Sequence, residues 1–213
     1  MRYDTPVDNM TDREYLEFTT ELFTGFDKIL KSNGVVIYNI NYGNENAELL
    51  FKTINEIIEK TPFTIGDVIV WKKTNALPNC HSNNKTTRIW EFVFIFCRDT
   101  EYNTFNSNKK AVGKHDTGQL TYENIFNFVE AKNNDGPCPF NKATYSSELC
   151  KKLLLMYAPK NAVVYDPFMG TGTTAIACYQ LSLNYIGSEI SAKQCEWANN
   201  RINEEMAQIR FEI

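Results

Sequence analysis

The segment DPFMGTGTTA, residues 166–175, constrains the fold of this chain more than any other feature, because it lies between a predicted strand and a predicted helix. Gly170 and Gly172 permit a tight turn and let a ligand approach the main chain closely. The helix that follows presents unpaired N–H groups and a partial positive charge at its N-terminus. The segment therefore predicts a ligand-binding turn; the alternative is a glycine turn that only eases the packing of a helix against a strand.

Glu189 stands at the end of the next predicted strand, residues 184–189. A carboxylate at such a place accepts hydrogen bonds from the hydroxyls of a ribose, each worth roughly 1.5–3 kcal/mol. The glycine turn and the acid together predict a site for a nucleoside-type ligand. The alternative is that Glu189 is only a solvated strand end.

The spacing Gly170-x-Gly172-x-x-Ala175 also fits the fingerprint of dinucleotide-binding folds. Such folds need several further strand–helix units after the fingerprint, whereas only residues 190–213 follow Glu189 here. The turn also has no side chain suited to a pyrophosphate. We therefore expect a cofactor with one nucleoside and no phosphate, of which S-adenosylmethionine is the common example, and a nicotinamide-dependent oxidoreductase is the less favoured alternative.

Apolar periodicity and turn residues divide the rest of the chain into alternating helices and strands. The first helix begins with a capping box, Thr11 to Glu14, and ends at Ser32-Asn33-Gly34, residues that tolerate left-handed dihedrals. The later elements are strands at 35–40, 66–72, 89–97, 162–166 and 184–189 and helices near 47–58, 121–130, 146–157, 173–181 and 191–209. Such alternation predicts a parallel sheet covered by helices on both faces.

Composition excludes several classes of protein. With 213 residues, 43% apolar and 23% charged, the chain is neither disordered nor fibrous, and one domain with an appendage is expected. The longest apolar run, 92–97, is too short to span a membrane, and the N-terminus has no apolar signal core. Six single cysteines without a CxxC pair predict reduced thiols in a cytoplasmic compartment. The adjacent Cys80 and His81 lack a second ligand pair, so we predict no metal site.

Several motifs resemble those of the DNA amino-methyltransferases with the beta order of motifs. Asp166 to Thr173 match the family's cofactor loop, Asp-Pro-Phe-x-Gly-Ser/Thr-Gly-Thr, and residues 187–189 match its Gly-x-Glu strand. Asn141, Lys142, Ala143, Thr144, Tyr145 and Leu149 are similar to the stretch that packs beside the methionine part of the cofactor. Residues 88–96 and 4–18 look like a late strand and the first helix of the family's target-base half. The resemblance covers almost the whole chain and is strongest from 141 to 202.

The resemblance implies an α/β fold with a doubly wound, mostly parallel sheet, the Rossmann-like methyltransferase fold, with an antiparallel hairpin and a small recognition insert. It implies one methyltransferase domain, 1–213, made of a target-base half (1–98), a target-recognition insert (99–135) and a cofactor half (136–213). It also implies that S-adenosyl-L-methionine is the cofactor. The side chains and turn residues that would hold it are Thr144, Tyr145, Ser146, Asp166, Pro167, Phe168, Gly170, Thr171, Gly172, Thr173, Thr174 and Glu189.

The family's chemistry needs a tetrapeptide Asp/Asn/Ser-Pro-Pro-aromatic, which holds the target amino group and stacks on the flipped base. The seven prolines of this chain include no Pro-Pro pair, and Asp4-Thr5-Pro6-Val7 lacks the second proline and the aromatic residue. We therefore expect a chain that begins just after this motif and is inactive as numbered, with its catalytic residues unknown. A non-catalytic relative is the alternative. A homodimer or a partner subunit is expected to cover the edge left by a missing strand.

Two basic stretches stand out in a chain whose net charge is −4. Residues 71–88 and 107–114 contain no acid, and their cations are Lys72, Lys73, Lys85, Arg88, Lys109, Lys110 and Lys114. Such side chains contact DNA phosphates. The alternative is that both stretches are solvated loops.

With the resemblance, the basic stretches predict contact with double-stranded DNA. The expected reaction is methyl transfer to adenine N6, favoured over cytosine N4, by a bacterial or viral restriction-modification enzyme.

Overall fold

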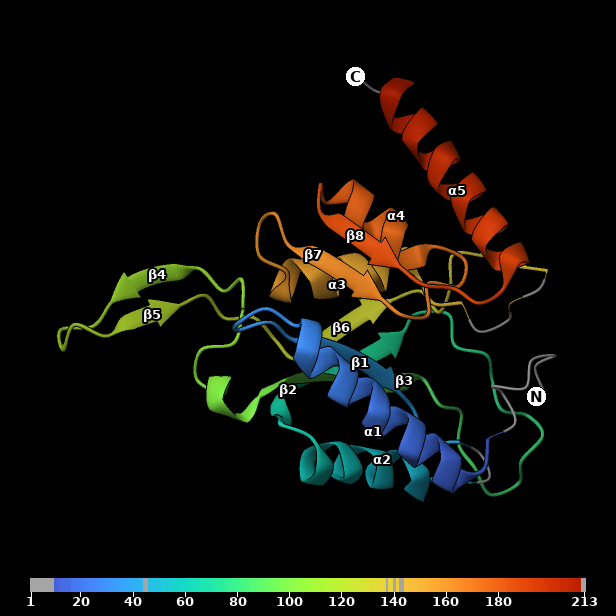
Figure 1. Cartoon of the computed structure of the whole chain (residues 1–213), viewed down its shortest axis with the longest axis horizontal. Coiled ribbons are helices and arrows are strands. Elements are labelled where there is room, and N and C mark those ends of the chain that lie inside the picture. Colours follow the sequence, from blue (N-terminus) through green and yellow to red (C-terminus); the bar gives the residue numbers. More distant parts are fainter. Residues whose placement is uncertain (1–9, 44–45, 137, 140, 142–143, 212–213) are drawn as a thin grey trace. The chain divides into compact units, whose positions relative to one another are not determined.

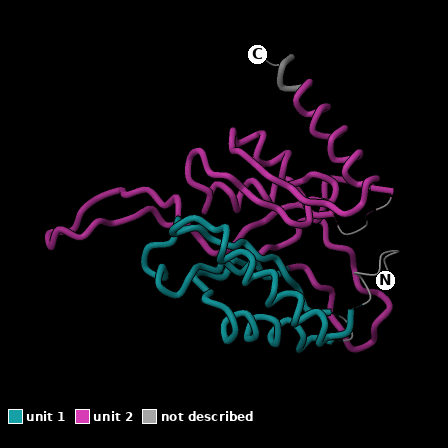
Figure 2. Tube along the Cα trace, in the orientation of Figure 1, with its two compact units in different colours: residues 1–70, 91–106 teal, residues 71–90, 107–213 magenta. Residues whose placement is uncertain are grey.

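A computed structural model describes residues 10–43, 46–136, 138–139, 141 and 144–211. These residues form two compact units (Figure 2): residues 1–70 and 91–106 make unit 1, and residues 71–90 and 107–213 make unit 2. None of the helices among the described residues is both long and apolar enough to cross a bilayer. Residues 4–7 and residues 142–143, which the sequence motifs drew on, lie outside the described residues.

Unit 1 pairs two helices with a sheet (Figure 1). In chain order its elements are α1 (Asp12–Ile29), β1 (Val36–Ile40), α2 (Glu48–Lys60), most of β2 (Phe63–Lys73), most of β3 (Trp90–Arg98) and the 3₁₀ turn η2 (Asp99–Glu101). The strand order in this unit is β1-β3-β2, and β1 runs antiparallel to β3 with Val36 opposite Phe96. Each of the helices and strands predicted here is found within a few residues of its expected bounds.

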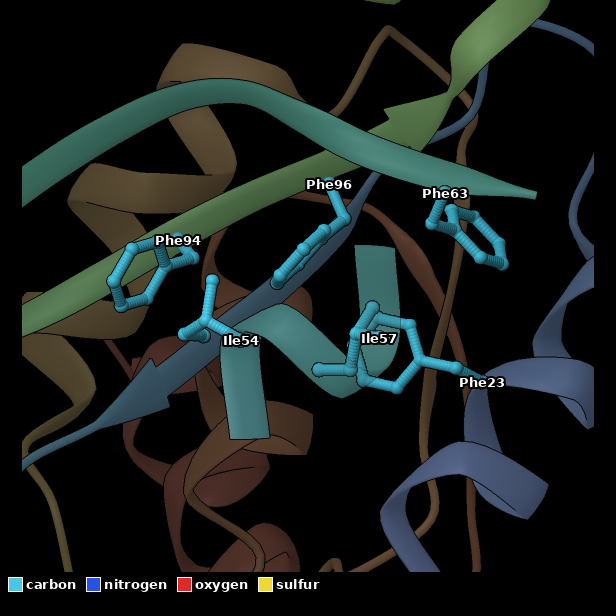
Figure 3. Packing of buried hydrophobic residues seen from close by; sticks show 6 residues of the cluster. All are labelled: Phe23, Ile54, Ile57, Phe63, Phe94 and Phe96. Atoms are coloured by element: carbon cyan, nitrogen blue, oxygen red, sulfur yellow. The ribbon is translucent and has the colours of Figure 1, made fainter. Parts of the chain in front are cut away.

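The core of unit 1 is aromatic. Phe23 of α1 lies among the side chains of Ile54, Ile57, Phe63, Phe94 and Phe96, as Figure 3 shows. The Phe23 ring is edge-on to its neighbours, with ring centres 5.1 Å from Phe96 and 5.6 Å from Phe63. Edge-to-face packing of this kind adds roughly 0.5–1.5 kcal/mol per pair beyond the burial of area. The two helices are therefore held on the sheet by one continuous apolar layer.

Both ends of α1 are closed by side chains. Thr11 and Glu14 form the predicted capping box, in which the Glu14 carboxylate accepts the Thr11 N–H at 2.7 Å. At the other end, Arg98 of β3 donates to the main-chain carbonyls of Asp27 and Leu30 at 2.7 and 2.8 Å. Its Nε also donates to the Asp27 carboxylate at 2.6 Å. One arginine thus satisfies carbonyls that a helix C-terminus leaves unpaired.

Unit 2 contains a parallel strand–helix–strand unit. Its elements are β4 (Ala111–Lys114), β5 (Leu120–Tyr122), β6 (Phe128–Ala131), α3 (Ser147–Tyr157), β7 (Val163–Asp166), α4 (Thr173–Gln180), β8 (Asn184–Gly187) and α5 (Ala192–Phe211). β7 and β8 are parallel, with Asp166 opposite Gly187. Val164 of β7 packs with Cys150 and Leu154 of α3 and Ala177 of α4, so these two helices cover one face of the strand pair.

The helix predicted at 121–130 is wrong. The structure has two strands there, β5 and β6, and in β6 the side chains of Val129 and Ala131 are buried while their neighbours are exposed. This period of two belongs to a strand that packs beside the end of β2, where the Trp71 indole N–H donates to the Ala131 carbonyl at 3.3 Å. Pairing with a distant strand outweighed the local helical pattern.

β4 and β5 form an antiparallel ribbon that extends from the rest of unit 2 (Figure 1), and all of its strand residues are exposed. The fold is thus a mixed α/β structure, with parallel pairing in β7–β8 and antiparallel pairing in β1–β3 and β4–β5.

Replacing Arg98 with methionine should lower the free energy of unfolding by about 2 kcal/mol, because charged hydrogen bonds to the end of α1 are lost from a side chain that is only 17% exposed. Urea denaturation measures this. Arg98→Lys keeps the charge without the planar fork and should recover only part of the loss. Arg13→Met, which removes a solvent-exposed partner of Glu17, is the control and should leave the midpoint unchanged. An equal loss in both methionine variants would contradict this account of α1.

Candidate cofactor site

The predicted glycine turn joins the end of β7 to the start of α4. Gly170 has φ of +52° and Gly172, the residue that precedes α4, has φ of +83°, values that side-chain-bearing residues rarely adopt. The turn is closed by hydrogen bonds from the Gly172 N–H to the Met169 carbonyl and from the Met169 N–H to the Ser188 carbonyl, both at 2.9 Å. It is therefore a built feature that ties the ends of β7 and β8 together.

Gly172 serves packing. It is buried, and a Cβ at this position would lie 3.0 Å from the Cβ of Ala198 in α5. A Cβ at Gly170 would lie 3.5 Å from the Asn141 amide nitrogen and 3.6 Å from the Gln194 amide oxygen. The first glycine thus lies beside polar side chains and the second beside a helix. Close packing against a helix therefore accounts for Gly172. Gly170 is the glycine whose main chain a ligand could approach.

The carboxylate of Glu189 lies at this turn. One of its oxygens accepts the Gly170 N–H at 2.9 Å, and the other accepts the Ser191 N–H at 2.8 Å. An ionised carboxylate has about four positions for hydrogen-bond donors, so two remain for a ligand. Glu189 is half-buried, and its two main-chain donors fix the direction in which the remaining positions point.

Five residues form the accessible part of the site: Phe168, Gly170, Glu189, Asn141 and Gln194. The Phe168 residue is 56% exposed at the turn, so an aromatic side chain borders the site. The Asn141 amide donates to the Gln194 carbonyl oxygen at 2.7 Å, so the segment before α3 meets the first turn of α5. An aromatic face, a half-buried carboxylate and two amides suit an uncharged nucleoside.

Other predicted cofactor residues turn inward. Asp166 accepts the Phe168 N–H at 2.9 Å and the Thr174 hydroxyl at 2.5 Å, and the Tyr145 hydroxyl contacts that of Thr174. Burial raises the pKa of Tyr145 well above its ordinary value, so its hydroxyl stays protonated. Ser146 is fully buried and caps α3, since its Oγ accepts the Leu149 N–H at 3.2 Å. These side chains shape the turn from behind.

The remaining residues predicted to hold the cofactor are buried or half-buried around the turn. Thr173 is buried, and its hydroxyl donates to the Tyr145 carbonyl at 3.4 Å. Thr171 is also buried, whereas Pro167 and Thr144 are half-buried.

Arg201 of α5 was not predicted from the sequence. Its guanidinium donates to the main-chain carbonyl of Thr171 at 2.9 Å and to the Thr171 hydroxyl at 3.1 Å. It also lies 3.3 Å from the carboxylate of Asp135, which accepts the Ser147 N–H at the start of α3. Arg201 stands one turn after Ala198 on α5, a spacing that places both on one face, but its partners come from distant segments. No local pattern could have indicated it.

The predicted DNA-contacting cations have different surroundings. The Lys72 ammonium lies 2.6 Å from the Glu130 carboxylate, and that of Lys73 lies 5.2 Å from the centre of the Trp71 ring. The other cations are the exposed Lys85, Lys109, Lys110 and Lys114 and the half-buried Arg88. The β4–β5 ribbon carries three of these lysines together with Asp116 and Glu123, and the Glu123 carboxylate accepts the Lys110 N–H at 2.9 Å.

A hollow of about 220 Å³ between α3, α4 and α5 is a separate feature, lined by Asp135, Ser147, Ile176, Gln180, Arg201, Glu204 and Glu205. Neither Phe168 nor Glu189 lines it, so it is distinct from the exposed part of the glycine turn. Within the described ranges no three His, Cys, Asp or Glu side chains gather as a metal site would require.

Comparison with known sequences places the chain in a family. A profile described as DNA methylase, of the N6 and N4 class, matches residues 3–200. The type II methyltransferase M.BglII of Bacillus subtilis is 24% identical over 207 residues, which are 87% of this chain and 56% of the relative. M.HinfI of Haemophilus influenzae is 28% identical over 205 residues, 90% of this chain and 52% of the relative. The chain thus spans about half the length of the curated relatives that it matches.

Solved structures of DNA methyltransferases share the fold of this chain. The cytosine-N4-specific PvuII DNA methyltransferase superposes with a TM-score of 0.72 at 13% identity, over 98% of this chain and 81% of that one. The complex of M1.HpyAVI with S-adenosylmethionine superposes with a TM-score of 0.60 at 20% identity, over 87% and 82% of the two chains. With the profile match across most of its length, the chain belongs to the DNA methylase family of N6- and N4-specific enzymes.

Proposed function

We propose that residues 166–174 and Glu189 hold S-adenosylmethionine in a methyltransferase that modifies an exocyclic amino group of DNA. The observation that carries this proposal is the Glu189 carboxylate fixed 2.9 Å from the Gly170 N–H at a glycine turn. The cofactor of the family has an adenosine group, and that group needs a place for a ring and an acceptor for two sugar hydroxyls. Phe168 and Glu189 offer both beside one main-chain turn.

The residues present fit the cofactor. Gly170 leaves the main chain uncovered between Asn141 and Gln194, and the half-buried carboxylate has positions left to accept from the ribose. When bound, the cofactor supplies a methyl group activated by a sulfonium. The residues of this chain bind and orient it: Phe168 stacks on the ring, Glu189 accepts from the sugar, and the amides of Asn141 and Gln194 bound the space beside Gly170.

The basic ribbon is proposed to contact the DNA. Lys109, Lys110 and Lys114 are exposed on or beside β4, in a two-stranded ribbon whose width suits the major groove. We propose adenine N6 as the favoured target, with cytosine N4 as the other member of the class. The division into a target-base half (1–98), a recognition insert (99–135) and a cofactor half (136–213) belongs to the same proposal.

The setting proposed for the protein is that of its bacterial relatives, the cytoplasm, where the chain meets DNA. A homodimer or a partner subunit is part of the proposal, because Val163, Tyr165 and Ile186 leave an apolar face of β7–β8 exposed. Residues 1–213 contain no Pro-Pro pair. Because the family's chemistry needs such a pair, binding of the cofactor and of DNA is the property of this chain to measure.

Deleting the sugar hydroxyls from the ligand should weaken binding to the wild-type chain but scarcely to Glu189→Gln. S-adenosylhomocysteine should bind wild type at least about a hundredfold more tightly than its 2′,3′-dideoxy analogue, because two charge-assisted hydrogen bonds are lost. In Glu189→Gln the preference should fall below about threefold. Isothermal titration calorimetry with both ligands and both proteins closes the double-mutant cycle.

Using a ratio of two ligands cancels any general damage that the substitution does to the turn. Equal preference in both proteins would show that Glu189 does not hold the sugar. Tighter binding of NAD than of S-adenosylhomocysteine would favour the oxidoreductase alternative.

Neutralising the ribbon should flatten the salt dependence of DNA binding. The variant Lys109→Gln, Lys110→Gln, Lys114→Gln should reduce the slope of log K against log salt by about 3, near 0.9 for each lost phosphate contact. Fluorescence anisotropy with a labelled duplex between 50 and 200 mM salt measures the slope. The control is Lys28→Gln, Lys31→Gln, Lys160→Gln, which removes the same charge elsewhere. If both triple variants change the slope equally, only net charge matters and the ribbon has no special part.

A further inference from the structure

We infer that Tyr145, Thr174 and Asp166 form a buried relay of hydrogen bonds that positions the cofactor turn, and that these three are positioning residues which do not contact the ligand. The inference rests on the proposed function. The sequence predicted that these three residues contact the ligand, whereas we infer that they act on the site through Phe168.

The direction of each hydrogen bond follows from counting protons. A threonine hydroxyl has one proton, and that of Thr174 points to the Asp166 carboxylate at 2.5 Å. The contact between Tyr145 and Thr174 must then use the tyrosine proton. Tyr145 therefore donates to Thr174, and Thr174 donates to Asp166, each bond polarising the next.

The relay ends on the main chain of the turn. The second oxygen of Asp166 accepts the N–H of Phe168 at 2.9 Å. Phe168 is the exposed aromatic residue of the site, and Gly170 follows it by two residues. The Asp166 carboxylate thus accepts a side-chain donor from α4 and a main-chain donor from the turn. It therefore fixes the position of the turn relative to the start of α4. The Tyr145 hydroxyl also lies 3.5 Å from the Asp166 oxygen that accepts from Thr174, so a change at Tyr145 would reach the turn through Asp166, both directly and by way of Thr174.

The relay lies beside an uncharged thiol of α3. Thr174 is buried, and the neighbouring Cys150 of α3 has its pKa raised to about 12 by burial, so its thiol carries no charge. Tyr145 immediately precedes Ser146, which caps α3, and this ties the relay to a fixed helix end. Removing the Thr174 hydroxyl would take a hydrogen bond from a carboxylate that is itself half-buried, which costs binding or stability.

The test compares variants that remove single hydroxyls with variants that keep them. Tyr145→Phe and Thr174→Val should weaken binding of S-adenosylhomocysteine about tenfold, measured by calorimetry well below the melting temperature. Thr174→Ser restores the hydroxyl and should bind like wild type. Tyr179→Phe removes a tyrosine hydroxyl from the same helix, outside the relay, and should also bind like wild type.

A second measurement needs no ligand. Hydrogen exchange of the Phe168 amide, followed by NMR, should be slow in wild type and Thr174→Ser and at least tenfold faster in Thr174→Val, because Asp166 then keeps only the longer, 3.5 Å contact with the Tyr145 hydroxyl. Wild-type affinity together with unchanged Phe168 exchange in Thr174→Val would overturn the relay. If wild type itself fails to bind S-adenosylhomocysteine, the proposed function falls, and the exchange rates still decide whether the relay holds the turn.

Discussion

The site depends on one carboxylate that holds two main-chain turns together. Glu189 accepts the N–H of Gly170 from the turn after β7 and the N–H of Ser191 from the turn after β8. These two turns lie at the carboxyl ends of neighbouring parallel strands, the place where α/β folds bind ligands. Because both oxygens of Glu189 are held by main chain, the remaining lone pairs have a fixed direction before any ligand arrives, which lowers the cost of ordering the site on binding.

Three further contacts keep these turns in place, two from α5 and one from α4. Ala198 of α5 packs on Gly172, where a Cβ would lie only 3.0 Å from the Ala198 Cβ. Arg201 holds the carbonyl of Thr171, and its partner Asp135 also receives the first N–H of α3. Thr174 of α4 binds Asp166 from behind. In the function that we propose, these contacts would fix the turn that holds the cofactor.

Much of this arrangement follows from local sequence, and some of it does not. Thr11 and Glu14 predict a helix start because a capping box involves residues three apart, and Asn33 predicts a left-handed turn because its side chain tolerates φ of 59°. Arg98 and Arg201 each donate hydrogen bonds to carbonyls that are distant in sequence, so these contacts could be learned only from the structure. The strand β6 was missed for the same reason, since its partner is the end of β2. Tyr145 and Thr174 were predicted to hold the cofactor, and that their hydroxyls are directed at Asp166 could be learned only from the structure.

The most direct test of the central claim is a crystal structure of the chain with S-adenosylhomocysteine. The account predicts density for the adenosine at the 166–174 turn, with the ring against Phe168 and both sugar hydroxyls within hydrogen-bond distance of Glu189. Density that places the sugar away from Glu189, or a ligand bound in the hollow beside Arg201, would contradict it.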